Sequence, residues 1–354
     1  MFIYLTSKRY PGSTADHAYI HALAQAFARQ LKDKFLLVVD SWGANATIPT
    51  YIIPAPHRFR TLYHFFHFPY FVFSQRLTGE ETLFFANDWN LLLIALFWKH
   101  VLFARYRVVS DWHMMLRNWK DGVVARGSSL LITTSEHLAG LISSKTGVPL
   151  SKIRTVHGGV DLLSYVQPAA SRAEFGFPES ARLIGYVGYF KTLGQDKGIG
   201  TMLDALAHLP ENDVMVFVGA RASEVEEYTA YARRLGVEKR CRFILAVSSD
   251  KVAAYEKAMD VLVIPYPNEP HFRDFGFPMK TYEYLAAQKP IVYSDLDIID
   301  EVLSGKGTPF TAGDPVALAQ ALSHLKSPAQ PISMTEYSWD AKAERILEAA
   351  DGYL

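Results

Sequence analysis

Short runs of apolar residues alternate with stretches of helical spacing along nearly the whole chain of 354 residues. Runs too short for helices and rich in Val, Ile, Leu and Phe are typical of buried parallel strands. Their alternation with amphipathic stretches predicts βα units and an α/β fold. Because 354 residues exceed the length at which a single core usually stops growing, we expect two domains.

The first series of predicted elements occupies roughly the first half of the chain. Its strands are MFIYLTS, FLLVVDSW, TLFFAND, YRVVSDW and SLLITTS. Its clearest helices are predicted at Thr14–Leu31 and Glu136–Thr146, and the hydroxyl of Ser135 suits the N-cap of the second. These elements predict a doubly wound domain over residues 1–165.

The second series follows a turn-like stretch between Ser164 and Ser171, where we expect a hinge. Its strands are ARLIGYVGYF, DVMVFVGA, CRFILAV, DVLVIPY and KPIVYSD. Helices are predicted between them near Thr201–His208, Ser223–Leu235, Lys251–Ala258 and Met279–Gln288. We expect a second doubly wound domain over residues 166–336 and a final helix over residues 337–354, which would pack back on the first domain.

The stretch FGFPMKTYEYLAAQKPIVYSD predicts a helix that begins at Pro278, because a first helical position needs no N–H group. Met279 and Tyr282 recur at helical spacing and should face the core, which leaves Lys280 and Glu283 together on another side. Such a pair is often only a solvated ion pair. Here, however, it follows the predicted strand Val261–Pro265 and so lies where open α/β sheets bind ligands.

The chemistry at this helix start suits a nucleotide sugar. Unpaired N–H groups and the positive end of the helix dipole, after a glycine-containing loop, favour an anion. A glutamate accepts hydrogen bonds from vicinal sugar hydroxyls, and a lysine binds phosphate. Together these groups could hold both ends of a ribosyl diphosphate.

Composition narrows the class of protein. Hydrophobic residues make up 49% and charged residues 20% of the chain, and the formal net charge is zero, which favours a globular protein and gives no reason to expect nucleic acid as partner. The single Cys241 excludes an internal disulfide, and the start MFIYLTSKRYPG shows no signal peptide, so we expect a cytoplasmic location. We recognise no Asp-x-Asp metal site on the donor side and no His/Cys cluster, so we expect no metal and no cofactor.

Five segments, in order along the chain, resemble motifs of the GT-B glycosyltransferases of family 4. They are KIRTVHGGVD, GYVGYFKTLGQDKGIGTMLDAL, ILAVSSDKVAAYEKAMDVLVIPY, PMKTYEYLAAQKPIVYSD and SWDAKAERIL. The resemblance implies two Rossmann-like domains that face each other across a cleft, the first on the acceptor side and the second binding a UDP- or GDP-linked sugar. It also implies sugar transfer with retention at the anomeric carbon.

The resemblance assigns roles to residues that match the family motifs. Glu283 matches the glutamate that binds the ribose hydroxyls, and Lys197 matches the lysine at the donor phosphates. Tyr189 stands after Gly188 where the family has arginine, so Lys191 could supply that charge. The donor-binding set implied is Gly12, Gly188, Tyr189, Lys191, Lys197, Asp274, Gly276, Phe277, Pro278, Met279, Lys280 and Glu283.

One position departs from the family in a residue that matters for sugar recognition. The first motif glutamate is replaced by Phe275, and Asp274 or Glu269 could substitute for its carboxylate.

The first half should supply the acceptor side. KRYPGSTADHAYIHALAQAFA resembles the family's glycine loop, with Gly12 and Ser13, and FFANDWNLLLIAL resembles a segment in which Asp88 and Trp89 are either structural or in contact with the acceptor. YRVVSDWHMM places Asp111 and His113 at the carboxyl end of a strand, and His113 falls near the family's active-site histidine. The alternation of strand side chains leaves open which of the two points inward. The expected catalytic set is His113, Asp111, Lys197 and Glu283.

The segment HRFRTLYHFFHFPYFVFSQR, residues 57–76, is dense in aromatic residues with basic residues near both ends. It is too short and too rich in histidine to span a bilayer. It is either a helix that covers the sheet or a surface that docks on a membrane, with its rings at the level of the headgroups.

These observations favour a glycosyltransferase that uses a nucleotide sugar and a sugar or lipid-linked acceptor in glycan biosynthesis. Three alternatives stay open at this point. A sugar-nucleotide epimerase of the same architecture would also hold a nucleotide but needs further acid and base groups around the sugar. A nicotinamide-dependent dehydrogenase needs a glycine-rich turn between strand and helix, and GYVGYF lies largely within a strand. A binding protein without activity would fit the departures at Tyr189 and Phe275.

Overall fold

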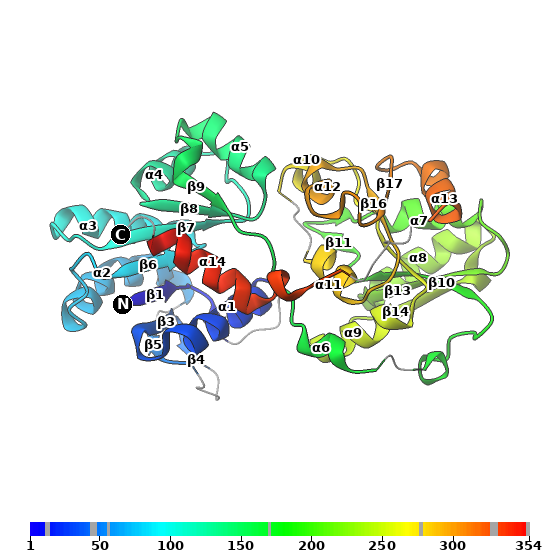
Figure 1. Ribbon diagram of the computed structural model, residues 1–354, viewed down its shortest axis with the longest axis horizontal. Helices are drawn as coiled ribbons and strands as arrows, with labels where there is room; N and C mark the ends of the chain where they lie inside the picture. The colour runs from blue at the N-terminus through cyan, green and yellow to red at the C-terminus, as the bar shows by residue number, and fades with distance from the viewer. Residues whose placement is uncertain are drawn as a thin grey trace. The chain divides into compact units, whose positions relative to one another are not determined.

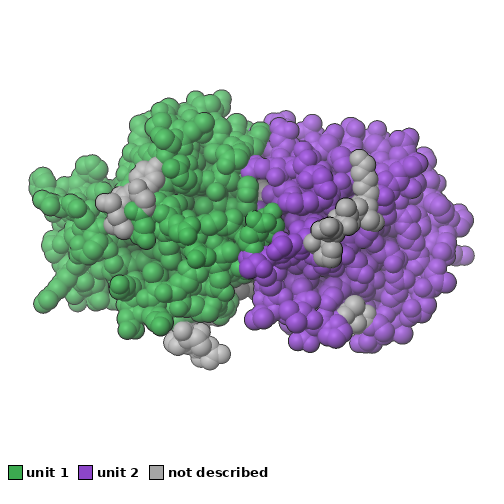
Figure 2. All heavy atoms as spheres, viewed as in Figure 1, with its two compact units in different colours: residues 1–159, 336–354 green, residues 160–335 purple. Residues whose placement is uncertain are grey.

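The structure is a computed structural model, and it describes residues 1–10, 15–42, 48–54, 57–168, 171–275, 279–325 and 332–351. The chain forms two compact units, one of residues 1–159 with 336–354 and one of residues 160–335 (Figure 2). The first crossing between them lies between Gly159 and Val160, just ahead of the link expected at residues 164–171. That expected link contains the short helix α6 (Leu163–Val166) of the second unit.

A parallel sheet forms the centre of the first unit, with helices against it (Figure 1). Its strand order is β5-β3-β1-β6-β7-β8-β9, and each neighbouring pair is parallel. The strands are β1 (Phe2–Leu5), β3 (Phe35–Val39), β5 (Thr50–Ile52), β6 (Leu83–Ala86), β7 (Arg107–Trp112), β8 (Leu130–Thr133) and β9 (Ile153–Thr155). The helices are α1 (Ala15–Leu31), α2 (Arg60–Ser74), α3 (Trp89–Val101), α4 (Trp119–Gly127), α5 (Glu136–Thr146) and α14 (Trp339–Asp351).

The second unit repeats this plan. Its parallel sheet has the order β14-β13-β10-β15-β16-β17. The strands are β10 (Arg182–Val187), β13 (Asp213–Ala220), β14 (Cys241–Leu245), β15 (Val261–Ile264), β16 (Ile291–Ser294) and β17 (Thr308–Phe310). The longer helices are α7 (Ile199–Leu206), α8 (Ala222–Arg234), α9 (Ser249–Ala258), α10 (Pro270–Asp274), α11 (Lys280–Ala286), α12 (Asp297–Leu303) and α13 (Pro315–Ser323). Two small pairs, β2 (Arg9–Tyr10) with β4 (Ser41–Trp42) and β11 (Lys191–Thr192) with β12 (Gln195–Asp196), lie outside the main sheets.

The predicted fold class, two doubly wound α/β domains, is confirmed. Both main sheets wind outward from their first strand in two directions, which is the order of a doubly wound sheet. Their central strands are buried along their whole length, because helices cover both faces. This burial is why the strands could be read as continuous apolar runs.

Two helix starts show how caps set the boundaries. Ser135 caps α5 as predicted, since its hydroxyl accepts a hydrogen bond from the Leu138 N–H group at 3.1 Å. Helix α7 begins at Ile199, earlier than predicted, because a carboxylate oxygen of Asp196 accepts from the Ile199 N–H group at 2.7 Å. The start expected at Pro278 lies outside the described residues, and α11 is described from Lys280 onward.

The last helix, α14, belongs to the first unit and packs against α1 (Figure 1). Arg29 of α1 binds Asp340 at 2.7 Å, and the buried amino group of Lys342 donates to the Val156 carbonyl at 2.6 Å. Within the part of the chain that the structure describes, no helix is both long and apolar enough to cross a membrane.

Candidate active site

Three predicted donor residues, Gly188, Lys280 and Glu283, lie where the second sheet changes its winding direction, between β10 and β15. In doubly wound sheets, ligands bind beyond the carboxyl ends of the strands at this point. Gly188 directly follows β10, and α11, with Lys280 and Glu283, follows β15 and packs against it. Segments almost a hundred residues apart in sequence therefore meet at one edge of the sheet.

Lys280 lies against the backbone of Gly188. A Cβ atom built on Gly188 would lie 1.7 Å from the Lys280 amino nitrogen, and the residue has a φ of +137°, a conformation that favours glycine. The same nitrogen is 5.1 Å from the centre of the Tyr186 ring, within the range of a cation–π contact. Glycine at this position therefore leaves room for the ammonium group at the end of β10.

Two carboxylates accompany this lysine. Burial raises the pKa of Glu283, and the charge of Lys280 opposes that rise. Glu256 of α9 is fully buried, and burial together with the negative charge of Glu283 raises its pKa well above the usual range. The Tyr165 hydroxyl donates to Glu256 at 2.6 Å. Burial also lowers the pKa of Lys280, while Glu283 and Glu256 act to raise it. Lys280, Glu283 and Glu256 thus influence one another's charge in a region of reduced solvation.

Lys197 supplies a second positive group. Burial, and then the charge of Lys280, lowers the pKa of Lys197 to about 7. Its amino nitrogen lies 5.9 Å from the centre of the Tyr266 ring, just after β15. Burial and the charge of Lys197 lower the pKa of His271 in the same neighbourhood. Two lysines that disfavour each other's charge would be stabilised by an anion placed between them.

The other predicted donor residues lie in varied settings. Lys191 does not supply an unpaired charge, because its amino nitrogen lies 2.7 Å from both carboxylate oxygens of Glu227. Tyr189 is exposed, and Asp274 is buried beside Arg273 at 2.8 Å. Met279 is the N-cap residue of α11. Gly12, Ser13, Gly276, Phe277 and Pro278 lie outside the described residues.

In the first unit, Asp111 points inward and His113 is partly exposed. Asp111 is buried and accepts a hydrogen bond from the Tyr19 hydroxyl at 2.8 Å, and an imidazole nitrogen of His113 lies 3.1 Å from the same carboxylate oxygen. Burial acts to raise the pKa of Asp111, but His113, Lys342 and the Tyr19 hydroxyl outweigh it and hold that pKa below its usual value. This arrangement makes Asp111 a group that orients His113.

Asp88 and Trp89 both have structural contacts. Asp88 caps α3 by accepting from the N–H groups of Asn90 and Leu91, and it also accepts from the Ser7 hydroxyl. The indole N–H group of Trp89 donates to Asp121 at 3.0 Å. Asp88 nevertheless remains partly exposed, at the end of β6 beside the end of β1.

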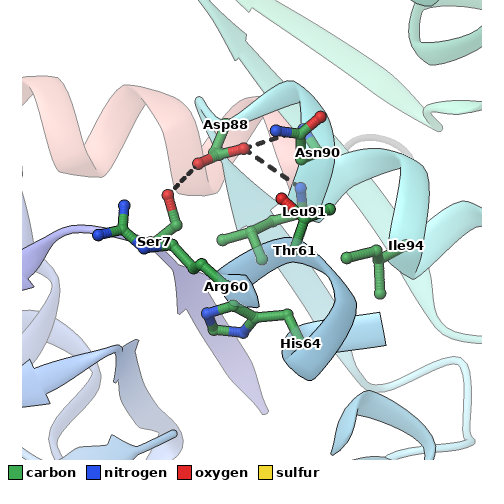
Figure 3. A pocket seen from close by; sticks show the side chains of 8 residues that line it. All are labelled: Ser7, Arg60, Thr61, His64, Asp88, Asn90, Leu91 and Ile94. Atoms are coloured by element: carbon green, nitrogen blue, oxygen red, sulfur yellow. Dashed lines mark hydrogen bonds between the residues drawn. The ribbon is translucent and has the colours of Figure 1, made fainter. Parts of the chain in front are cut away.

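A hollow of about 240 Å³ lies at this point, which is where the first sheet changes its winding direction (Figure 3). It is lined by residues from the end of β1 and from the first turns of α2 and α3, namely Ser7, Arg60, Thr61, His64, Asp88, Asn90, Leu91 and Ile94. Behind it, the buried carboxylate of Asp40 lies 2.6 Å from Arg60 and binds His64. Hydroxyl, amide, carboxylate and guanidinium groups therefore face one small space that could hold a hydroxylated ring.

Sequence reasoning missed several of these residues. Glu256 lies among ordinary charged residues of α9, and no sequence signal separates it from its solvated neighbours. Arg60 and His64 are four residues apart, which places them on one helix face, but Asp40 joins them only through the fold. Among the described residues, no group of three or more His, Cys, Asp or Glu side chains could hold a metal ion.

Parts of the chain are similar in sequence to known proteins. Residues 181–327 match the family described as glycosyl transferases group 1. The D-inositol 3-phosphate glycosyltransferase of Xylanimonas cellulosilytica is 29% identical over 222 residues, which are 58% of this chain and 50% of that protein. The chain spans about half the length of the curated relatives it matches.

Solved structures match over the whole chain. Anabaena HepE in complex with UDP-glucose has a TM-score of 0.73 and 19% identity, with 99% of each chain covered. The lipopolysaccharide outer core galactosyltransferase WaaB has a TM-score of 0.77 and 18% identity, with both chains fully covered. At these identities the likeness shows the fold alone, which is the GT-B fold.

The comparisons therefore show the GT-B fold and a match of residues 181–327 to the group 1 glycosyltransferase family. Within this range the chain is similar to the group 1 glycosyltransferases, as the sequence motifs of the second half predicted. The names of these relatives do not favour the epimerase or the dehydrogenase alternative.

Proposed function

We propose that this protein transfers a sugar from a nucleoside diphosphate donor, preferably a UDP-sugar, to an acceptor hydroxyl with retention at the anomeric carbon. The observation that carries the proposal is the meeting of Lys280, Glu283 and Lys197 at the switch point of the second sheet, beside a glycine with no side chain to obstruct a ligand. Structures of Anabaena HepE with UDP-glucose and with UDP support the choice of base.

Each group has a separate task. Glu283 receives the ribose hydroxyls, because a carboxylate accepts hydrogen bonds from two adjacent hydroxyls. Lys197 and Lys280 face the diphosphate and stabilise the negative charge that grows on it as the bond between the sugar and the phosphate breaks. The acceptor oxygen forms the new bond to the anomeric carbon, and its proton passes to the departing phosphate. These residues supply the charge in this scheme without a metal ion, so EDTA should leave turnover intact.

On the acceptor side we propose the hollow between β1 and β6. Its mixture of donors and acceptors suits the hydroxyls of a single sugar or cyclitol ring, free or attached to a lipid. The name of the inositol phosphate relative and that of WaaB, which acts on lipopolysaccharide, support such acceptors. We place the enzyme in the cytoplasm, where it would work at the inner face of the membrane.

The donor proposal is tested by calorimetric titration of UDP into the wild type and into Glu283→Gln. Loss of the charged acceptor should weaken binding by about tenfold, since a hydrogen bond to a charged group contributes roughly 1.5–3 kcal/mol. Glu226→Gln is the matched control, because Glu226 is exposed on α8. Equal dissociation constants for the wild type and Glu283→Gln would remove Glu283 from the donor site.

A further inference from the structure

Helix α2 is apolar on two sides, and the described part of the chain covers only one of them. His64, Phe68, Phe71 and Val72 are buried in the first unit. Leu62, Phe66, Tyr70 and Phe73 recur at helical spacing on another side and are exposed, with 66% of the Phe66 surface and 58% of the Phe73 surface accessible. Large apolar side chains gathered on one surface mark an interaction site more often than single exposed ones do.

The exposed side continues onto α3, which packs against α2 (Figure 1). The Phe65 ring lies 5.3 Å from the Phe66 ring and 5.0 Å from the Phe97 ring, and the Trp98 indole N–H group donates to the Phe65 carbonyl at 2.7 Å. Phe103, just after α3, is 92% exposed, with a φ of +52° that is uncommon outside glycine. We name the six residues Leu62, Phe66, Tyr70, Phe73, Phe97 and Phe103 the aromatic face.

The two helical segments that carry the aromatic face contain basic residues and no acidic ones. Residues 57–76 and 89–107 contain no Asp or Glu, although the chain as a whole has no net charge. They contain six cationic residues, which are Arg58, Arg60, Arg76, Lys99, Arg105 and Arg107. Glu80 lies 3.6 Å from Arg105, and Asp40 neutralises Arg60, whereas Arg58 and Arg76 are exposed. An anionic partner fits this surface, and a second copy of the same face would bring like charges together.

We propose that the aromatic face docks on an anionic phospholipid surface. Exposed aromatic rings beside arginines are the composition of a helix that lies in the membrane interface. The fifteen residues of α2 rise only about 22 Å, less than the hydrocarbon thickness of a bilayer. The first turn of α2 also lines the hollow proposed for the acceptor, so the same helix would rest on the bilayer and help to hold a lipid-linked headgroup. The role of α2 in holding a lipid-linked headgroup rests on the proposed function, whereas docking on the bilayer does not.

The test is co-sedimentation of the full chain with vesicles of phosphatidylcholine alone or mixed with phosphatidylglycerol. The wild type should sediment with the mixed vesicles and be released by salt. The double variant Phe66→Ser/Phe73→Ser should bind at least about tenfold more weakly, because two rings no longer enter the interface. Leu163→Ser/Val166→Ser is the matched control, since both residues are exposed on α6 of the second unit.

The outcomes separate the docking proposal from the enzyme proposal. Equal sedimentation of the wild type and the aromatic variant, or no sedimentation of either, would overturn docking. A concentration-dependent dimer of the wild type that the aromatic variant abolishes would instead assign the face to a second copy. Binding of UDP, measured without vesicles, reports on the donor site independently of these results.

Discussion

At the scale of single residues, the proposed donor site contains a lysine whose charged form is disfavoured by burial. The pKa of Lys197, lowered to about 7 by burial and by Lys280, leaves a mixture of charged and neutral amine near neutral pH. A bound diphosphate favours the charged form and must raise this pKa. We therefore expect donor binding at the proposed site to be coupled to proton uptake.

We predict uptake of up to one proton per UDP bound at pH 8, declining toward zero as the pH falls below 6. Above pH 7 the free protein has lost the Lys197 proton and regains it with the ligand, whereas at low pH the proton is already present. Calorimetry in buffers of different ionisation enthalpy measures this number. Lys197→Met should remove most of the uptake, and an unchanged proton count in that variant would assign the proton to another group.

Gly188 is the second residue whose effect can be predicted. In Gly188→Ala the new methyl group must displace the Lys280 ammonium group, which lies at 1.7 Å from the Cβ position. UDP should bind at least about tenfold more weakly, because a charged contact is lost. Gly194→Ala is the control, since Gly194 also has a positive φ, of +80°, but has nothing within 4 Å of the Cβ position. If both variants weaken UDP binding equally, backbone strain and not Lys280 explains the effect.

At the scale of elements, much of the second unit could be predicted because its strands are apolar runs and its donor helix carries a motif. Residues such as Glu256, Asp40 and Arg60 could not be predicted, because their role arises only when distant segments meet. The predicted start of α7, near Thr201, lies after the observed start at Ile199 because of a local cap. A carboxylate before a glycine can begin a helix, and the apolar pattern used to place helices does not include such caps.

The capping hydrogen bond of Asp196 at α7 should contribute measurably to the free energy of unfolding. Asp196 accepts from the Ile199 N–H group at 2.7 Å and from the Tyr228 hydroxyl at 2.6 Å. Asp196→Ala should lower the free energy of unfolding by about 1–2 kcal/mol in urea titrations. Asp204→Ala, which loses only the hydrogen bond from Tyr231, should cost less than about 1.5 kcal/mol and leave the loop at Lys197 intact. Equal losses would show that the cap contributes nothing beyond one hydrogen bond.

At the scale of the whole molecule, the chain leaves the first unit at Gly159 and returns to it at Glu336. Gly159 has a φ of +120°, and its N–H group donates to the Tyr337 carbonyl at 2.9 Å. A Cβ atom at Gly159 would lie 2.6 Å from the ring of Trp339, so the exit and the return are packed together. The first unit is thus closed by residues that follow the second unit in sequence.

Gly159→Ala should destabilise the first unit by about 2–4 kcal/mol, from a strained backbone conformation and a displaced Trp339 ring. Thermal unfolding followed by tryptophan fluorescence measures the change. Gly147→Ala, with a φ of +74° and nothing within 4 Å of the Cβ position, carries the backbone strain alone and should cost less. A Gly159→Ala protein as stable as Gly147→Ala would show that Trp339 moves aside freely.

This return has a consequence for biosynthesis. On the ribosome, residues 160–335 are complete before the helix that seals the earlier unit has been made. The first unit therefore lacks the helix that packs against α1 at this stage, while the second unit can already fold. Molecular chaperones would meet this protein with its first unit still unfinished, and the synthesis of α14 lets that unit close.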